Sequence, residues 1–123
     1  MGGFMKNKVT GRYWSYLIRN ARKRNIEVKV TQEEAWVIFL KQNKKCVYTG
    51  IKLTHLKYSK KVNGISIYKA GTASIDRKDS SLGYTKKNIQ WVHKDVNRMK
   101  MNFKEKYFLK LCKLIARRLI NAT

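Results

Sequence analysis

The 123-residue chain has no proline, two cysteines and only seven acidic residues. Cys46 and Cys112 lie far apart, so they cannot supply the paired Cys-x-x-Cys motifs of a structural zinc site, and we expect two reduced thiols and no structural zinc. The longest apolar run, residues 35–40, is far shorter than the roughly 18 residues of a membrane-spanning helix. The N-terminal segment also lacks the apolar core of a secretion signal. We therefore expect a cytoplasmic protein without a membrane span.

Lysine and arginine number 29, which gives a formal net charge of +22 at pH 7. Self-repulsion of this size destabilises a compact state unless a polyanion neutralises it, so nucleic acid or an anionic membrane surface is the expected partner. Hydrophobic residues make up 43% of the chain, too many for a disordered basic tail. The length fits one compact domain, which we place at residues 11–123, after a flexible arm at residues 1–10.

Apolar spacing and turn residues together predict an α+β fold. Three- and four-residue apolar steps predict a basic amphipathic helix from residue 12 to about residue 25. Thr31 and Glu34 have the spacing of a capping box, so a second helix is expected from Thr31 to about residue 43. Asn63-Gly64 is typical of a two-residue hairpin turn. The other predicted elements are strands at residues 65–67, 73–75 and 89–92 and helices at residues 94–101 and 104–120.

All three aspartates of this acid-poor chain fall in one short segment, where they accompany an arginine, two asparagines and a histidine. The members of this cluster are Asp76, Asp79, Asp95, Arg77, Asn88, Asn97 and His93. Asp, Asn and His are donors suited to a hard or borderline divalent cation, which would draw a phosphodiester into a basic groove. The simpler alternative is that Asp76 pairs with Arg77 or a nearby lysine, that His93 caps a helix, and that Asn97 is a surface amide.

The same segment resembles the core of the HNH (ββα-metal) endonucleases, particularly the small phage and mobile-element type. Residues 73–100 carry the resemblance and read ASIDRKDSSLGYTKKNIQWVHKDVNRMK. Similarity covers roughly residues 12–103 and leaves the last helix outside it. The resemblance implies a ββα-metal centre at about residues 65–103, flanked by N-terminal helices and one C-terminal helix, in a bacterial or phage-infected cell.

In that family a hairpin, a loop and a helix enclose one divalent metal ion that binds the scissile phosphate. The resemblance implies that Asp76 and Asn97 are metal ligands and that Asn88 braces the loop by hydrogen bonds. His93, one turn before Asn97, is a further candidate as metal ligand or proton carrier. Mg²⁺ is the expected ion, with Mn²⁺ or a similar ion as an alternative.

The chain departs from the usual family pattern at Arg77, which stands where most members have the histidine that acts as general base. A guanidinium stays protonated at neutral pH and cannot accept a proton, but it can hold a phosphate bidentately. Three sources of the base therefore stay open. These are His93, water activated by the metal without a side-chain base, and a tyrosine such as Tyr84 or Tyr68.

The expected function is metal-dependent hydrolysis of phosphodiester bonds in DNA, with double-stranded DNA as partner and no membrane. Ten basic residues are candidates for DNA contact: Arg19, Arg22, Lys23, Arg24, Lys57, Lys60, Lys61, Lys78, Arg98 and Lys100. A non-catalytic nucleic-acid-binding module with an eroded HNH site is the main alternative, and a ribosomal-type RNA-binding protein is a weaker one. The sequence leaves open whether the chain is a monomer or a homodimer.

Overall fold

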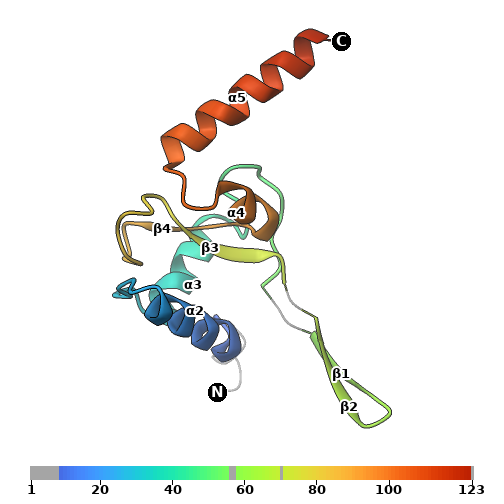
Figure 1. Ribbon diagram of the computed structural model, residues 1–123. Coiled ribbons are helices and arrows are strands. Elements are labelled where there is room, and N and C mark those ends of the chain that lie inside the picture. The colour runs from blue at the N-terminus through green and yellow to red at the C-terminus, as the bar shows by residue number, and fades with distance from the viewer. Residues whose placement is uncertain (1–8, 56–57, 70, 123) are drawn as a thin grey trace.

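The computed structural model describes residues 9–55, 58–69 and 71–122, with the backbone alone for residues 58–60 and 66–69. The described chain is a small α+β protein with helices at both ends and two separate antiparallel hairpins between them (Figure 1). Its helices are α2 (Gly11–Lys23), α3 (Gln32–Lys41), α4 (Lys94–Lys100) and α5 (Glu105–Ala122). Its strands are β1 (Tyr58–Val62), β2 (Ile65–Lys69), β3 (Ala73–Arg77) and β4 (Ile89–His93). The α+β prediction is confirmed.

Both N-terminal helices begin at a threonine cap and end before an asparagine. Thr10 caps α2, and Thr31 caps α3 with the reciprocal hydrogen bonds of a capping box to Glu34. Asn25 and Asn43 have φ values of 55°, in the left-handed region that asparagine tolerates and that ends a helix. The two helices are therefore slightly shorter than predicted.

The predicted arm at residues 1–10 extends too far. Residues 1–8 lie outside the described residues, but Val9 is fully buried and Thr10 caps α2. The backbone N–H of Thr10 also donates to Nε2 of His55 at 3.0 Å. The domain therefore includes Val9 and Thr10.

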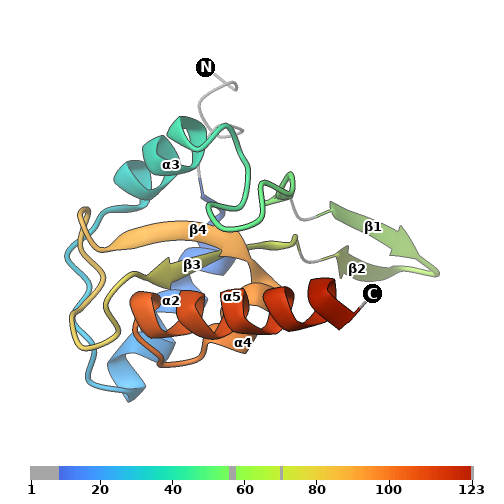
Figure 2. The ribbon, with the colours of Figure 1, turned by 90° about the horizontal axis from the view of Figure 1, so that it is seen from above.

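Strands β3 and β4 pair in a register that sets Asp76 opposite Gln90 and Ala73 opposite His93, and α4 follows β4 directly. The hairpin lies between α4 on one side and α2 and α3 on the other (Figure 1), and Figure 2 gives the view from above, with α5 in front. Because side chains alternate along a strand, one face of the hairpin points toward the core and the other toward α4. This arrangement gives a β-β-α order over residues 73–100.

The core lies between β4 and the N-terminal helices and is centred on Trp91, which is fully buried. Its ring packs against Phe39 with centroids 5.0 Å apart, and its Nε1 donates to the carbonyl of Ala35 at 2.8 Å. From α2, the Tyr13 hydroxyl accepts from the N–H of Ile75 in β3, and burial raises the pKa of Tyr13 to about 12. These contacts fix the hairpin against α2 and α3.

The second hairpin, β1 and β2, forms a sheet of its own and extends away from the body (Figure 1). Asn63 and Gly64 connect its strands with φ values of 52° and 79°, as the Asn-Gly signal predicts. The strand predicted at residues 65–67 therefore pairs with β1 and not with β3. The ββα unit accordingly begins at Ala73, later than the predicted start near residue 65.

Candidate metal and phosphate site

A small cavity of about 90 Å³ opens where β3, the loop after it, the end of α4 and the end of α2 meet. Its walls are Arg24, Ile75, Asp76, Arg77, Ser80, Tyr84, Asn97, Met101 and Asn102. Asp76, Arg77 and Asn97, which the sequence places in one candidate site, thus line one cavity. Arg24, predicted to contact DNA, lines it as well.

Asp76 points from β3 toward α4 and is only 4% exposed. Its Oδ1 lies 3.1 Å from the Lys100 ammonium, and its Oδ2 accepts from Gln90 Nε2 at 3.0 Å. A carboxylate has about four lone-pair positions, so these two contacts leave each oxygen able to accept another ligand. Asp76 is therefore a paired carboxylate with acceptor capacity to spare.

Lys100 is fully buried, which corrects its predicted role in DNA contact. Its ammonium binds both Asp76 Oδ1 and, at 2.9 Å, the backbone carbonyl of Arg77. The position at the end of α4 brings this side chain under β3, where it compensates a charge that would otherwise be buried alone. The simpler reading, in which Asp76 pairs with a nearby lysine, is therefore confirmed.

The Asp76 contacts continue into a polar network that reaches α5. Gln90 Nε2 lies 2.7 Å from the Tyr48 hydroxyl and 3.2 Å from Glu105 Oε1, and the Tyr48 hydroxyl donates to the same Glu105 oxygen at 2.7 Å. Burial and the hydrogen bond to Glu105 raise the pKa of Tyr48. Tyr48, Gln90 and Glu105 were not candidates from the sequence, because nothing in their spacing connects them to Asp76.

Arg77 is 8% exposed and holds the loop that follows β3. Its Nη1 donates to the carbonyls of Ser80 and Leu82 at 2.7 and 2.9 Å, and its guanidinium carbon lies 5.3 Å from the centre of the Tyr84 ring. A guanidinium has five N–H donors, so these two bonds leave donors for an anion in the cavity. Arg77 combines a structural contact with an unused cationic surface.

Tyr84 is held at the cavity by the extended segment between α2 and α3. The Tyr84 N–H donates to the Glu27 carbonyl at 2.8 Å, and the Tyr84 carbonyl accepts from the N–H of Lys29 at 2.9 Å. Gly83 is needed for this approach, because a Cβ there would lie 2.6 Å from the Glu27 carbonyl oxygen. Of the two tyrosines considered as a base, Tyr84 lines the cavity, whereas Tyr68 belongs to β2 in the other hairpin.

Asn88 braces the loop, as the resemblance implies. Its Oδ1 accepts from the N–H of Asp79 at 3.0 Å, and its Nδ2 donates to the carbonyls of Asp79 and Gly83 at 3.0 and 2.9 Å. The Asp79 carboxylate turns to Ser81 instead of the cavity, and the hydroxyl and backbone hydrogen bonds from Ser81 lower the pKa of Asp79.

Asn97 turns its amide nitrogen toward β3 and lines the cavity. The Nδ2 donates to Ser74 Oγ at 2.7 Å and to the Ile75 carbonyl at 3.2 Å. A carbonyl oxygen can only accept, so the Ile75 contact fixes which end of the amide is the nitrogen. Within the described part of the chain, Oδ1 of Asn97 accepts no hydrogen bond and is therefore open to a cation.

His93 does not line this cavity, which corrects its predicted place in the site. It is the N-cap of α4, with extended backbone angles, and its Nδ1 accepts from the N–H of Asp95 at 3.1 Å. The spacing argument fails because His93 precedes the first helical turn, so it does not lie one turn below Asn97 on α4. It also faces the opposite side of the hairpin from Gln90 and Asp76.

The other predicted DNA-contacting residues are exposed wherever the structure describes them. Arg24 reaches the cavity and donates from Nη2 to Asn102 Oδ1 at 3.1 Å. Lys57 and the Lys60 side chain lie outside the described residues. The remaining exposed residues are Arg19, Arg22, Lys23, Lys61, Lys78 and Arg98.

The donor set suits a hard cation that keeps most of its ligands as water and phosphate. Asp76 offers a carboxylate and Asn97 an amide oxygen, and Mg²⁺ is commonly held by one or two carboxylates with substrate phosphates and water. Across residues 9–55, 58–69 and 71–122, no three His, Cys, Asp or Glu side chains gather into one metal-binding group. Any ion here would therefore depend on these two oxygen donors.

No protein-family model, curated protein or solved structure matches the chain.

None of the helices in the described residues is both long enough and apolar enough to cross a bilayer. The two cysteines are free, with Cys46 buried in the core and Cys112 half-buried on α5.

Proposed function

We propose that the protein is a metal-dependent DNA endonuclease of the HNH type. The observation that carries the proposal is the meeting of Asp76, Arg77 and Asn97 at one cavity within a β-β-α unit. An acidic oxygen donor, an amide oxygen donor and an arginine are the groups needed to bind a cation and a phosphate side by side. The resemblance of residues 73–100 to HNH enzymes supports the same reading.

Asp76 and Asn97 would hold the metal ion, Mg²⁺ or a similar cation, through their side-chain oxygens. When bound, such an ion draws the scissile phosphate into the site and stabilises the negative charge that develops on it. Gln90 and Lys100 keep the Asp76 carboxylate fixed in position, and the Nδ2 contacts to Ser74 and Ile75 orient Asn97.

Arg77 and Arg24 would bind the phosphate from two sides, because both cations line the cavity. Tyr84 is the side chain that we assign as the base: as the phenolate, with its own proton lost to solvent, it would accept the proton of the attacking water at its phenolic oxygen. It lines the cavity beside Arg77, whereas His93 lies outside it. Asn88 keeps the loop that carries Tyr84 closed.

The test is incubation of purified protein with supercoiled plasmid at low salt, with Mg²⁺, Mn²⁺ or EDTA. We expect nicked or linear plasmid with metal and none with EDTA. Asp76→Ala and Asn97→Ala should abolish cleavage, while Asp95→Ala, which removes an exposed carboxylate outside the cavity, should retain it. Equal cleavage by Asp76→Ala and the parental protein would show that the metal assignment is wrong.

A non-catalytic DNA-binding module is the second candidate, and one observation favours it. The Asp76 charge is already neutralised by the buried Lys100, and Arg77 is bound to two loop carbonyls, so both groups have a structural use without any ligand. This candidate predicts plasmid that is retarded but intact with every metal, with binding that falls steeply as salt rises.

A further inference from the structure

The C-terminal helix α5 leaves the body and projects into solvent (Figure 1). Its first turn is anchored, because Glu105 hydrogen bonds to Tyr48 and Phe108 packs against the Tyr48 ring with centroids 5.7 Å apart. Phe108 is the one buried residue of the helix, and every described residue from Lys113 onward is exposed. A projecting helix of this kind gains little stability from packing against the body, and its exposed surface is accessible to another molecule.

The surface of α5 is cationic along one side and also exposes large apolar side chains, which are Tyr107, Leu114, Ile115, Leu119 and Ile120. It carries basic side chains at Lys106, Lys110, Lys113, Arg117 and Arg118, and its one acid, Glu105, is turned inward toward Tyr48. Among the described residues, the ion pairs are Lys29–Glu27, His93–Asp95 and Lys100–Asp76, and none involves this helix. Its cations are thus uncompensated by the rest of the described chain.

Four of these cations follow one another at steps of four, three and four residues, which brings them onto one face. We call Lys106, Lys110, Lys113 and Arg117 the α5 stripe. At about 1.5 Å per residue, the stripe is about 16 Å long. One strand of duplex DNA presents a phosphate about every 3.4 Å along the axis, so the stripe spans about five phosphates.

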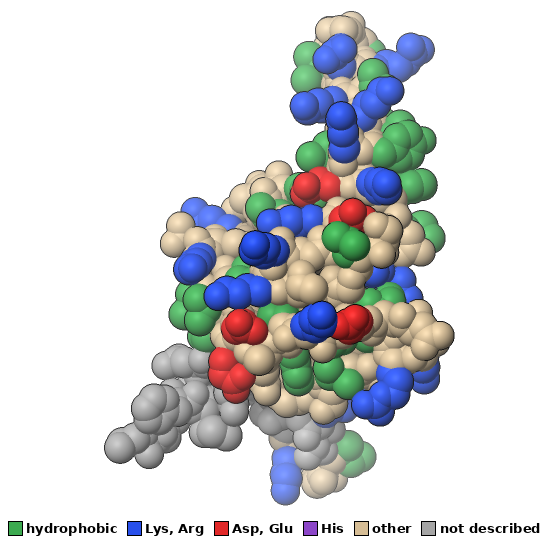
Figure 3. All heavy atoms as spheres, turned by 90° about the vertical axis from the view of Figure 1, so that its left-hand side faces the viewer, with side chains coloured by type: hydrophobic (Ala, Val, Ile, Leu, Met, Phe, Trp, Pro, Cys, Tyr) green, Lys and Arg blue, Asp and Glu red, His purple; other side chains and the backbone are tan. Residues whose placement is uncertain are grey.

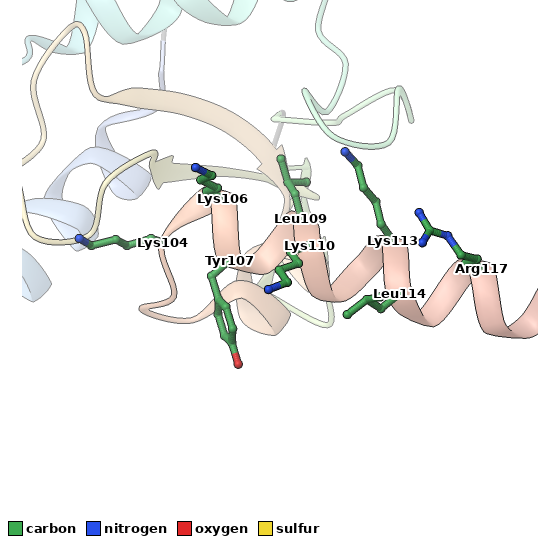
Figure 4. A pocket seen from close by; sticks show the side chains of 8 residues that line it. All are labelled: Lys104, Lys106, Tyr107, Leu109, Lys110, Lys113, Leu114 and Arg117. Carbon is green, nitrogen blue, oxygen red and sulfur yellow. The ribbon is translucent and has the colours of Figure 1, made fainter.

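A shallow groove runs along this face of α5, with apolar side chains between the cations. Figure 4 shows Lys106, Lys113 and Arg117 extending to one side of the helix, with the Lys110 side chain turned to the other flank beside Tyr107 and Leu114. Like charges at this spacing repel each other and destabilise an isolated helix, so a polyanion bound along the groove would remove a cost that the free protein carries. Most of the groove wall is apolar, and it is the lysine and arginine head groups along it that suit a phosphate backbone.

The α5 stripe also follows the candidate site closely along the chain. It begins shortly after Asn102, which lines the cavity and binds Arg24. Figure 3 shows Lys and Arg side chains along α5 and on the face of the body below it. A second copy of this chain would bring the same positive charge against the stripe, which disfavours self-association through this face.

We infer that the α5 stripe binds the DNA phosphate backbone next to the cavity and so extends the DNA-binding surface beyond the ββα unit. This inference rests on the proposed function for the identity of the ligand, but not on cleavage. Each phosphate contact contributes roughly 0.9 to the slope of log affinity against log salt. Four contacts therefore contribute about 3.6.

The test is fluorescence anisotropy of a labelled 20-base-pair duplex in EDTA, between about 50 and 200 mM salt, so that cleavage plays no part. The α5 variant carries Lys106→Gln, Lys110→Gln, Lys113→Gln and Arg117→Gln. The matched control carries Lys41→Gln, Lys44→Gln, Lys45→Gln and Lys52→Gln, which removes the same charge from four exposed positions around the end of α3. Circular dichroism and thermal unfolding check that both variants fold like the parent.

We expect the salt slope of the α5 variant to fall by about 3.6 and that of the control by less than one. Equal slopes in the two variants would overturn the inference, while leaving the plasmid test of the nuclease proposal unaffected. Binding to vesicles of anionic phospholipid that is lost in the α5 variant, with an unchanged DNA slope, would also overturn it and assign the stripe to a membrane surface. A change of oligomeric state without a change of slope would assign the face to a second copy and overturn it as well.

Discussion

Asp76 and Lys100 form an ion pair that is almost completely buried between β3 and α4. Removing one partner of such a pair leaves an uncompensated charge in the interior, which costs about 3–5 kcal/mol. We therefore expect Lys100→Met to lower the free energy of unfolding by about that amount. Urea denaturation in EDTA measures the difference.

The control is the double variant Asp76→Asn/Lys100→Met, which removes both charges. The double variant should recover most of the lost free energy of unfolding, because replacing a buried ion pair by uncharged side chains often changes stability little. A loss below 1 kcal/mol in the single variant would contradict the buried pairing. The double variant also keeps the test informative if the single variant fails to fold.

Asn88 holds the loop after β3 with one accepted and two donated hydrogen bonds. Asn88→Asp keeps the acceptor for the Asp79 N–H but turns the two donations into contacts between a carboxylate oxygen and carbonyl oxygens. Leaving such buried groups unsatisfied costs about 1–3 kcal/mol. We expect a lower melting temperature and a plasmid cleavage rate lowered at least tenfold, with Asn121→Asp, at an exposed position of α5 outside the cavity, as the control. An unchanged melting temperature would contradict the bracing role.

For single residues, the sequence predicts which residues lie at the site better than it predicts their hydrogen-bond and ion-pair partners. Asp76, Arg77, Asn88 and Asn97 stand out because acids are scarce and the segment resembles a known family. Lys100 does not, since one lysine among many carries no sign that it is buried. His93 misleads because a four-residue step places two side chains together only when both lie within a helix.

Helix α3 depends on the capping box between Thr31 and Glu34, whose two hydrogen bonds are each 3.0 Å. Thr31→Ala should lower the free energy of unfolding by about 1 kcal/mol at pH 7. Thermal unfolding measures the loss, and Ser15→Ala, which removes an exposed hydroxyl within α2, serves as control. No loss in Thr31→Ala would contradict the cap.

The Glu34 part of the cap predicts a dependence on pH. The hydrogen bond from the Thr31 backbone lowers the pKa of Glu34 below its ordinary value in the folded protein. A group with a lowered folded pKa stabilises the fold above its unfolded pKa and loses this contribution as pH falls through the folded value. The stability difference between the parent and Glu34→Gln should therefore be present at pH 7 and shrink toward pH 3. A difference that grows on acidification would contradict this reading.

Elements with local signals were predicted well, and long-range pairings were not. Caps and apolar spacing are local, so α2, α3 and α5 lie close to the predicted ranges. The Asn63-Gly64 turn likewise predicts the β1–β2 hairpin. By contrast, the pairing of β3 with β4 across a long loop, and the path of Val28 beside Tyr84, depend on tertiary packing that no short pattern contains.

For the whole molecule, the net charge of +22 makes self-repulsion a general cost of folding. At 0.1 M salt, interactions between exposed charges more than about 10 Å apart are largely screened, whereas the buried Asp76–Lys100 pair is affected far less. We therefore expect the melting temperature to rise as NaCl increases from low salt to about 0.5 M. The melting temperature of the α5 stripe variant should be higher at low salt and should rise less as salt is added. A melting temperature of the parental protein that falls as salt increases would contradict the account.

The measurement that tests the central claim most directly is Mn²⁺ binding at low salt, followed by the electron paramagnetic resonance signal of the free ion. The account predicts one site in the parental protein that is lost in Asp76→Asn/Asn97→Ala and retained in Asp95→Asn. It also predicts that inorganic phosphate strengthens this binding, because Arg77 and Arg24 line the same cavity. A binding curve unchanged in the double variant would contradict the assignment of Asp76 and Asn97 as the metal ligands.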